Sequence, residues 1–165
     1  MIPKLRTLAL ALAAVLAAPI AAAGTVTVSY DAQGTFTDAG TTPAEREKRL
    51  AELAAHLKAM GERRLGEDRT LSVELLDLDL TGTLRPSRHP SGDVRVVKSR
   101  ADGPRIELRY TLRDATKEIA AGRETLHDAS LPRIDRVPDA IGADPLRHEK
   151  KLLDQWFEAR FGRPQ

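Results

Sequence analysis

The sequence predicts an α+β domain, a two-layer sandwich in which a mainly antiparallel sheet of about five strands carries two helices on one face. Two observations support this prediction. Several short segments alternate apolar and polar residues with a period of two, as strands with one buried face do. Two other segments place apolar residues at helical spacing after a candidate capping residue. The expected order of elements is β-α-β-β-β-β-α.

Residues 1–23 have the features of a cleavable secretory signal. Basic residues precede a short apolar run, and three alanines stand directly before Gly24. This is the order of regions that a signal peptide needs. A retained membrane anchor is the alternative, but Pro19 and the alanine-rich composition of the run argue against a spanning helix. We therefore expect a periplasmic or secreted chain whose mature part, residues 24–165, is a single domain.

Composition argues against several kinds of function. Lys4 and Arg6 leave with the leader, so the mature domain has 24 basic and 24 acidic residues and no net charge. A nucleic-acid-binding domain needs a surplus of Lys and Arg on one face, so we expect no nucleic-acid partner. The chain has no cysteine, so no disulfide supports the fold and no thiol acts as nucleophile or metal ligand. After cleavage, no segment predicts a transmembrane helix.

The first strand and the loop after it follow from side-chain alternation. Val26, Val28 and Tyr30 alternate with threonine and serine, which predicts a strand with one buried face. The segment from residue 31 to residue 42 is rich in Gly, Thr and Asp and contains one large apolar residue, Phe36. It predicts a loop that this ring can hold in place.

The first helix is expected to begin at Thr42. The Thr42 hydroxyl can accept from an early backbone N–H, Pro43 suits the first helical position, and Glu45 can close a capping box. The apolar residues that follow at helical spacing are Leu50, Leu53, Ala54, Leu57 and Met60. Gly61 is expected to end the helix in a left-handed conformation.

Residues 71–80 predict a second strand with an irregularity. Its apolar residues alternate up to Leu75 and then shift by one position, starting from Leu76. Such a shift turns every later side chain to the opposite face of a sheet. Either a β-bulge near these two leucines restores the facing, or the strand is central and buried on both sides. The bulge is the simpler interpretation, because it also keeps Asp77 and Asp79 out of the core.

The second half of the chain predicts two long loops, three strands and a final helix. The strands are expected at residues 94–97, 106–112 and 119–126. Short turns join them, so they are expected to be antiparallel, whereas the crossover through the first helix makes the first two strands parallel. The loops are residues 81–92 and 128–144. Asp144 and Pro145 then predict the start of a helix that ends near Phe161 and, with half of the six aromatic residues, closes the core.

Polar residues near strand and helix ends form the candidate site. They are Asp38, Asp77, Asp79, Arg105, Glu124, Asp128 and Glu149. They can line an open polar pocket or form a network that ties the last helix to the sheet, and the network is the preferred interpretation. Asp77 and Asp79 share one face of a strand, so they can hold a hard cation or act as an acid–base pair. An aspartate at a strand end more often accepts from loop amides, and that structural role is favoured.

No motif for catalysis, a cofactor or a metal is found. The histidines are His56, His89, His127 and His148, and none of them is paired at a ligand spacing. No serine lies in the glycine-flanked turn of a nucleophile elbow. We therefore expect no enzymatic activity, no cofactor and no metal site.

Four stretches match one known family in order and spacing. They are residues 36–38, 76–82, 103–110 and 146–157. Together they resemble a family of exported bacterial proteins, the domain of unknown function 3016, over nearly the whole mature domain. Gly103 stands where an aromatic residue commonly precedes the Pro-Arg pair of that family, and the stretch after Asp128 lacks the expected aromatic residue. These two departures weaken the case for binding by the region around Gly103 and Asp128. The resemblance implies an exported domain and adds no activity.

The leading functional hypothesis is a non-catalytic binding or accessory protein of the cell envelope. Export and the two long loops, residues 81–92 and 128–144, motivate it, because long loops often carry contact surfaces. The partner is expected to be an envelope protein or a small ligand. The alternatives are a small periplasmic hydrolase that uses carboxylates such as Asp77 and Asp79, and a purely structural envelope protein.

Overall fold

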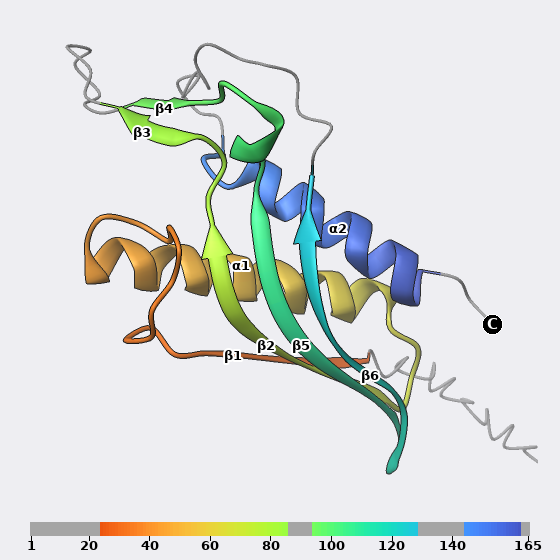
Figure 1. Ribbon diagram of the computed structural model, residues 1–165. Coiled ribbons are helices and arrows are strands. Elements are labelled where there is room, and N and C mark those ends of the chain that lie inside the picture. The colour runs from red at the N-terminus through yellow and green to blue at the C-terminus, as the bar shows by residue number, and fades with distance from the viewer. Residues whose placement is uncertain (1–23, 86–93, 129–143, 163–165) are drawn as a thin grey trace, which may run out of the picture.

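The computed structural model describes residues 24–85, 94–128 and 144–162, and on these residues the predicted α+β fold is confirmed (Figure 1). The elements are β1 (Thr25–Tyr30), α1 (Pro43–Arg64), β2 (Arg69–Asp79), β3 (Thr83–Arg85), β4 (Val94–Val96), the short 3-10 helix η1 (Arg100–Asp102), β5 (Arg105–Asp114), β6 (Lys117–His127) and α2 (Arg147–Phe161). Both helices lie behind one face of the main sheet. The predicted leader, residues 1–23, lies outside the described residues. None of the helices in the described ranges is long and apolar enough to cross a membrane.

The main sheet has the strand order β1-β2-β5-β6. β1 and β2 are parallel, as the crossover through α1 predicted, and the other pairs are antiparallel. The predicted strand at residues 94–97 does not join this sheet. β4 pairs instead with β3, which lies inside the predicted loop at residues 81–92. The chain leaves the main sheet at Gly82, whose φ of 74° lies in the left-handed region that favours glycine. The N–H of Gly82 donates to the carbonyl oxygen of Asp102.

The predicted β-bulge is present in β2. The register with β5 shifts between Leu75 and Asp77, so Leu76 is the extra residue. Leu75 and Leu78 are both buried, whereas Asp77 keeps part of its side chain in water. The bulge therefore returns the leucines to the core and leaves the aspartates at the surface.

The start of α1 is confirmed and its predicted end is wrong. Thr42 is the N-cap, its hydroxyl accepting from the backbone N–H of Glu45, although the Glu45 carboxylate accepts from Thr41. Gly61 does not end the helix, which continues to Arg64. A Cβ on Gly61 would lie 1.8 Å from Cγ2 of Val26, so this glycine serves close packing of the helix against β1.

The predicted start of α2 is displaced by two residues. The N-cap is Leu146, and the helix begins at Arg147. Asp144 still prepares the turn, because its Oδ1 accepts from the N–H of Leu146 at 2.8 Å and its Oδ2 from Lys150 at 2.7 Å. Leu146 is only 1% exposed, so the chain inserts an apolar side chain into the core before the helix starts.

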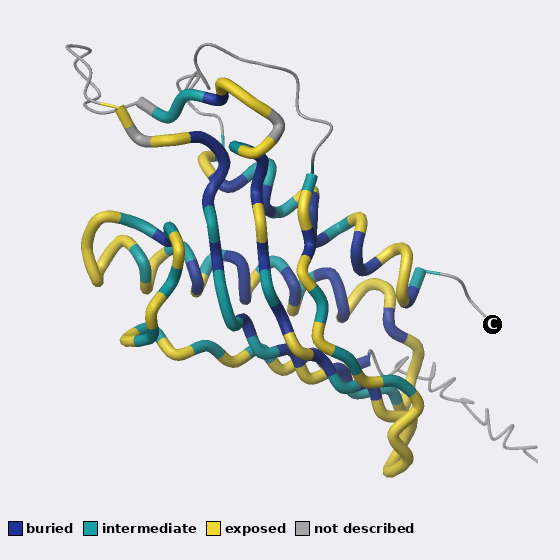
Figure 2. Tube along the Cα trace, viewed as in Figure 1, coloured by how far each residue is buried: buried dark blue, intermediate teal, exposed yellow. Residues whose placement is uncertain are grey.

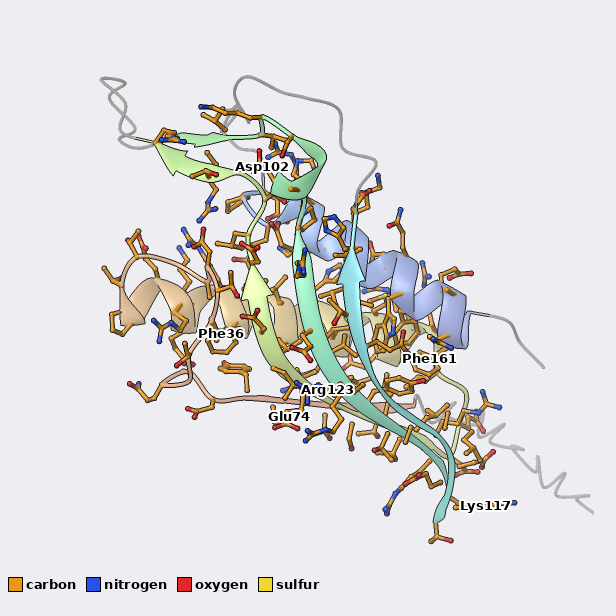
Figure 3. The ribbon with its side chains drawn as sticks, viewed as in Figure 1. Phe36, Glu74, Asp102, Lys117, Arg123 and Phe161 are labelled. Atoms are coloured by element: carbon orange, nitrogen blue, oxygen red, sulfur yellow. The ribbon has the colours of Figure 1, made fainter. Side chains whose placement is uncertain are left out.

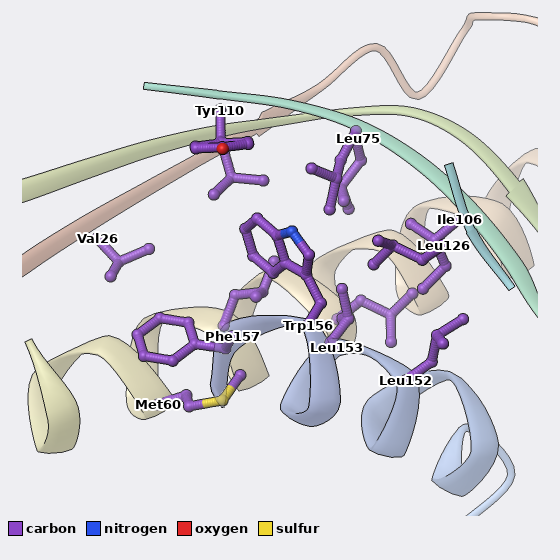
Figure 4. Packing of buried hydrophobic residues seen from close by; sticks show 14 of the residues in the cluster. Val26, Met60, Leu75, Ile106, Tyr110, Leu126, Leu152, Leu153, Trp156 and Phe157 are labelled. Atoms are coloured by element: carbon purple, nitrogen blue, oxygen red, sulfur yellow. The ribbon is translucent and has the colours of Figure 1, made fainter. Parts of the chain in front are cut away.

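The core lies between the helices and one face of the sheet (Figures 2 and 4). Burial alternates along β5, where Ile106, Leu108, Tyr110 and Leu112 are buried and the residues between them are not. Trp156 of α2 packs edge-on against Tyr110, with ring centroids 5.6 Å apart. The other face of the sheet, here called the open face, carries polar side chains. The last helix therefore closes the core, as its aromatic content predicted.

Candidate functional site

The structure distributes the candidate residues over three places. Asp38, Asp77, Asp79 and Arg105 lie at the end of β2, Asp128 and Glu149 lie near the start of α2, and Glu124 lies on the middle of β6. We call the first group, together with Arg95, the aspartate corner. The pair Thr81 and Glu149 is called the helix latch.

Asp77 fastens the loop after β1 to the end of β2. Its Oδ1 accepts from the N–H of Thr37 at 2.7 Å and from the N–H of Leu78 at 2.9 Å, and its Oδ2 accepts from the Thr37 hydroxyl at 2.7 Å. The bulge at Leu76 presents this carboxylate to the loop. Both oxygens are thus occupied by contacts within the chain.

Asp38 joins the same loop to the sheet and to β4. Its N–H donates to the carbonyl oxygen of Leu78 and its carbonyl oxygen accepts from Leu80, which forms a parallel bridge with Asp79. Its carboxylate pairs with Arg95 at 2.9 Å, and Arg95 also donates to the carbonyl oxygen of Gly82 at 2.7 Å. Three segments that are distant in sequence therefore meet at this corner.

Asp79 is the electrostatically perturbed member of the aspartate corner. Burial raises the pKa of its carboxyl group, and the neighbouring carboxylates of Asp38 and Asp77 raise this pKa further. Arg105, which faces Asp79 across the β2–β5 pair, and Arg95 act in the opposite direction. The proton on Asp79 is therefore held more tightly than on an ordinary aspartate.

The helix latch ties the first turn of α2 to the end of β2. Glu149 is 1% exposed, and its Oε1 accepts from the N–H of Thr81 at 2.7 Å and from the Thr81 hydroxyl at 2.8 Å. Oε2 of Glu149 is buried and has no hydrogen-bond partner among the described residues. A carboxylate in the first turn of a helix is also favoured by the helix dipole.

Asp128 and His148 lie near the latch. The N–H of Asp128 donates to the carbonyl oxygen of Pro104 at 3.4 Å, and a ring nitrogen of His127 contacts the same oxygen at 3.2 Å. Burial lowers the pKa of His148, and the charge of Arg147 lowers this pKa further, whereas Glu149 and Asp128 oppose the change. The neutral imidazole of His148 is therefore favoured.

Glu124 is separate from the other candidates. It pairs with Arg160 at 3.0 Å and so links β6 to the last turn of α2. Burial, together with the charge of Glu124, raises the pKa of Tyr110. A second link joins the helices to each other, because Lys150 pairs with Glu52 at 2.5 Å.

The candidate side chains do not converge on a single site. In the part of the chain that the structure describes, no three His, Cys, Asp or Glu side chains gather closely enough to hold a metal ion. His56 pairs with Asp154 at 2.7 Å. His89 lies outside the described residues. Most candidate carboxylates are engaged with donors of the chain itself. At the aspartate corner, the partly exposed Asp79 and the exposed Arg105 carry opposite charges at the surface.

The partners of the candidate residues were not predicted from the sequence. Thr37, Thr81 and Arg95 hold Asp77, Glu149 and Asp38, respectively. The partners are 40, 68 and 57 residues apart along the chain. No local pattern marks such pairs. The nearest signal was the position of Thr81 between a strand end and a glycine.

Comparisons with known proteins give one finding. The model of a family described as "Protein of unknown function (DUF3016)" matches residues 24–159. No curated protein and no solved structure matches the chain.

Proposed function

The chain belongs to the protein family of unknown function DUF3016, and we propose that it works outside the cytoplasm as a non-catalytic binding or accessory protein of the cell envelope. The binding surface of this proposal is the end of the sheet where the aspartate corner, β3 and β4 lie. The partner is an envelope protein or a small polar ligand.

The observation that carries the proposal is the way the polar residues at this end are used. Asp77 in the aspartate corner and Glu149 in the helix latch each accept from a backbone N–H and a hydroxyl, and these contacts hold this end of the sheet in place. Asp79 and Arg105 remain at the rim with opposite charge and partial or full exposure. Charged side chains at the ends of strands suit binding, because strands position side chains more precisely than loops do.

Export is supported by the leader-like residues 1–23 and by the start of the family match at residue 24. The test is the N-terminal sequence of the protein isolated from its native cells, together with cell fractionation. A mature N-terminus near Gly24 in the periplasm or medium is expected. Recovery of protein that still carries Met1, or recovery from cytosol alone, contradicts this part of the proposal.

Binding is tested by capture from an envelope extract on the immobilised chain, with two charge-reversal variants of matched chemistry. Arg105→Glu changes the rim of the corner, whereas Arg113→Glu changes an exposed arginine of the same strand near its other end. The parent and Arg113→Glu are expected to retain the same partner, and Arg105→Glu to lose it without a loss of folded structure. Absence of a reproducible partner from cells grown under several conditions contradicts the proposal.

A hydrolase that uses carboxylates is the second candidate, and one observation favours it. The pKa of Asp79 is raised, and a raised carboxyl pKa is a common property of a general acid. A screen of the folded chain with ester, glycoside and peptide substrates tests this alternative. Turnover that disappears in Asp79→Asn, while the variant remains folded, would replace the binding proposal.

A further inference from the structure

Strand β6 forms one edge of the main sheet (Figure 1). It has eleven residues, contains no proline, and pairs with β5 along its inner side. Among the described residues, no strand pairs with its outer side. Such an edge presents backbone N–H and C=O groups to any strand that fits it. The opposite edge, β1, has six residues and no charged side chain.

The pairing with β5 determines which face each β6 side chain occupies. The register shifts between Leu112 and Arg113, so Ile119 is the extra residue of a bulge in β6. Glu118 faces Arg113 of β5, and Arg123 faces Arg109 of β5. Arg109 and Arg113 are four residues apart on one strand, so both point to the open face. Glu118 and Arg123 therefore share the open face.

Two other charged residues of β6 lie on the helix side of the sheet. Lys117 faces Asp114 and Glu124 faces Leu108, and both of these β5 residues have the facing of buried Leu112. Between the two charged ends of β6 lie small residues, Ala120, Ala121 and Gly122. On the open face, the acidic Glu118 precedes Ala121 and the basic Arg123 follows it. On the helix side the order is reversed, with the basic Lys117 before Ala121 and the acidic Glu124 after it.

This order is self-complementary for antiparallel pairing. When a second β6 pairs with the first about a two-fold axis at Ala121, Ala120 faces Gly122, and the extra residue Ile119 is passed over. Glu118 then faces Arg123 of the second copy on the open face, and Lys117 faces Glu124 on the helix side. Symmetry makes each of these opposite-charge pairs occur twice.

Other registers lose this match. A two-fold axis at Ala120 sets Glu118 against alanine, and an axis at Gly122 sets it against threonine. An axis at Arg123 sets two arginines against each other, which is unfavourable for directly opposed residues. The register at Ala121 alone among these pairs opposite charges on both faces.

We infer that this chain forms a homodimer through antiparallel β6–β6 pairing centred on Ala121, which joins the two four-stranded sheets into one. Arg123 is exposed on the edge strand and Lys117 lies at its far end, beside the turn (Figure 3). Ile119, the large apolar side chain that is exposed at 44% in the described part of the chain, lies next to the centre of the interface and is shielded there. This dimer does not depend on the proposed function, because its interface is the edge strand β6 and includes no residue of the aspartate corner.

The absence of cysteine makes a direct test simple. Residues directly opposite each other in an antiparallel pair have Cα atoms roughly 4.5–5.5 Å apart, within the range of a disulfide. Ala121→Cys is expected to form disulfide-linked dimers under mild oxidation. Ser72→Cys, which introduces an exposed thiol on the open face of central strand β2, is the matched control. Pre-formed pairing should make the Ala121→Cys reaction at least about tenfold faster. Equal rates overturn the inference.

A charge exchange tests the register. Glu118 and Arg123 lie about 15 Å apart along one strand, so they do not meet within a chain. Glu118→Arg and Arg123→Glu are each expected to weaken dimerisation by about tenfold or more in sedimentation equilibrium, because each creates two like-charge contacts. The double variant restores opposite charges and should recover dimerisation. Each single change also alters a contact within the chain, because Arg123→Glu removes the ion pair of Arg123 with Glu107 and Glu118→Arg sets two arginines opposite each other in the β5–β6 pair. Circular dichroism of each variant therefore checks that it remains folded.

The outcomes separate clearly. Dimers that the single changes weaken and the exchange restores support the pairing about Ala121. A parent chain that sediments as a monomer at all concentrations overturns it. Dimers that are insensitive to all three charge variants also overturn it, since another surface must then join the copies.

Discussion

Replacement of Glu149 tests the energetics of the helix latch. In Glu149→Ala the Thr81 N–H and hydroxyl lose their acceptor while they remain buried, since Thr81 is 4% exposed. A buried donor left unpaired costs about 1–3 kcal/mol. Loss of the side chain at a position that is 1% exposed adds a cavity cost. We therefore expect a loss of about 3–5 kcal/mol in the free energy of unfolding.

Glu149→Gln gives the opposite expectation from the same geometry. The glutamine keeps a carbonyl oxygen for Thr81 and removes a buried charge, but it puts an NH2 group where Oε2 has no hydrogen-bond partner among the described residues, and these two effects oppose each other. The change is thus expected to alter the free energy of unfolding by less than about 1 kcal/mol, in either direction. Thr81→Val, which removes one of the two donors and keeps the backbone N–H, should cost about 1 kcal/mol.

The assay is thermal and urea unfolding followed by circular dichroism. For a domain of this size 1 kcal/mol corresponds to a Tm change of about 3–4 °C, so Glu149→Ala should lower Tm by about 10 °C or more. Two results would refute the reasoning. Glu149→Ala could melt within about 2 °C of the parent, or Glu149→Gln could be as damaging as Glu149→Ala, which would mean that the charge itself is needed.

Three further changes follow from the contacts described above. Asp77→Ala removes the acceptor of three hydrogen bonds and should lower the free energy of unfolding by about 1–2 kcal/mol, measured by urea unfolding, with Asp77→Asn closer to the parent. Because the pKa of Asp79 is raised in the folded state, ionisation of Asp79 opposes folding at neutral pH. Asp79→Asn should therefore have a higher Tm than the parent at pH 7, and the difference in Tm should vanish as the pH falls below 3.8, the ordinary pKa of an aspartate. A difference in Tm that does not change with pH would contradict the raised pKa. Gly61→Ala would place its Cβ 1.8 Å from Val26 and should cost about 1–3 kcal/mol, while Gly66→Ala, with nothing within 4 Å, serves as the control and should stay within about 0.5 kcal/mol.

The sequence alone was sufficient for the features that depend on neighbours along the chain. Period-two alternation located the strands of the main sheet, and the shift at Leu76 located the bulge in β2. Thr42 and Pro43 marked the start of α1. These signals are local, because a strand or a helix start is recognised from side chains within a few residues. The family membership rests on the same kind of information, read over the whole domain.

The tertiary structure decided the features that depend on residues far apart in the sequence. Gly61 has the sequence signature of a helix end, but it lies inside α1 because Val26 of β1 occupies the space of its missing side chain. The candidate carboxylates were named from the sequence, yet their partners, Thr37 for Asp77 and Thr81 for Glu149, became visible only once the chain had folded. Local periodicity determines which face of an element is apolar. The packing of the elements determines which polar groups meet, because a buried polar group must form a hydrogen bond and its partner can come from any part of the chain.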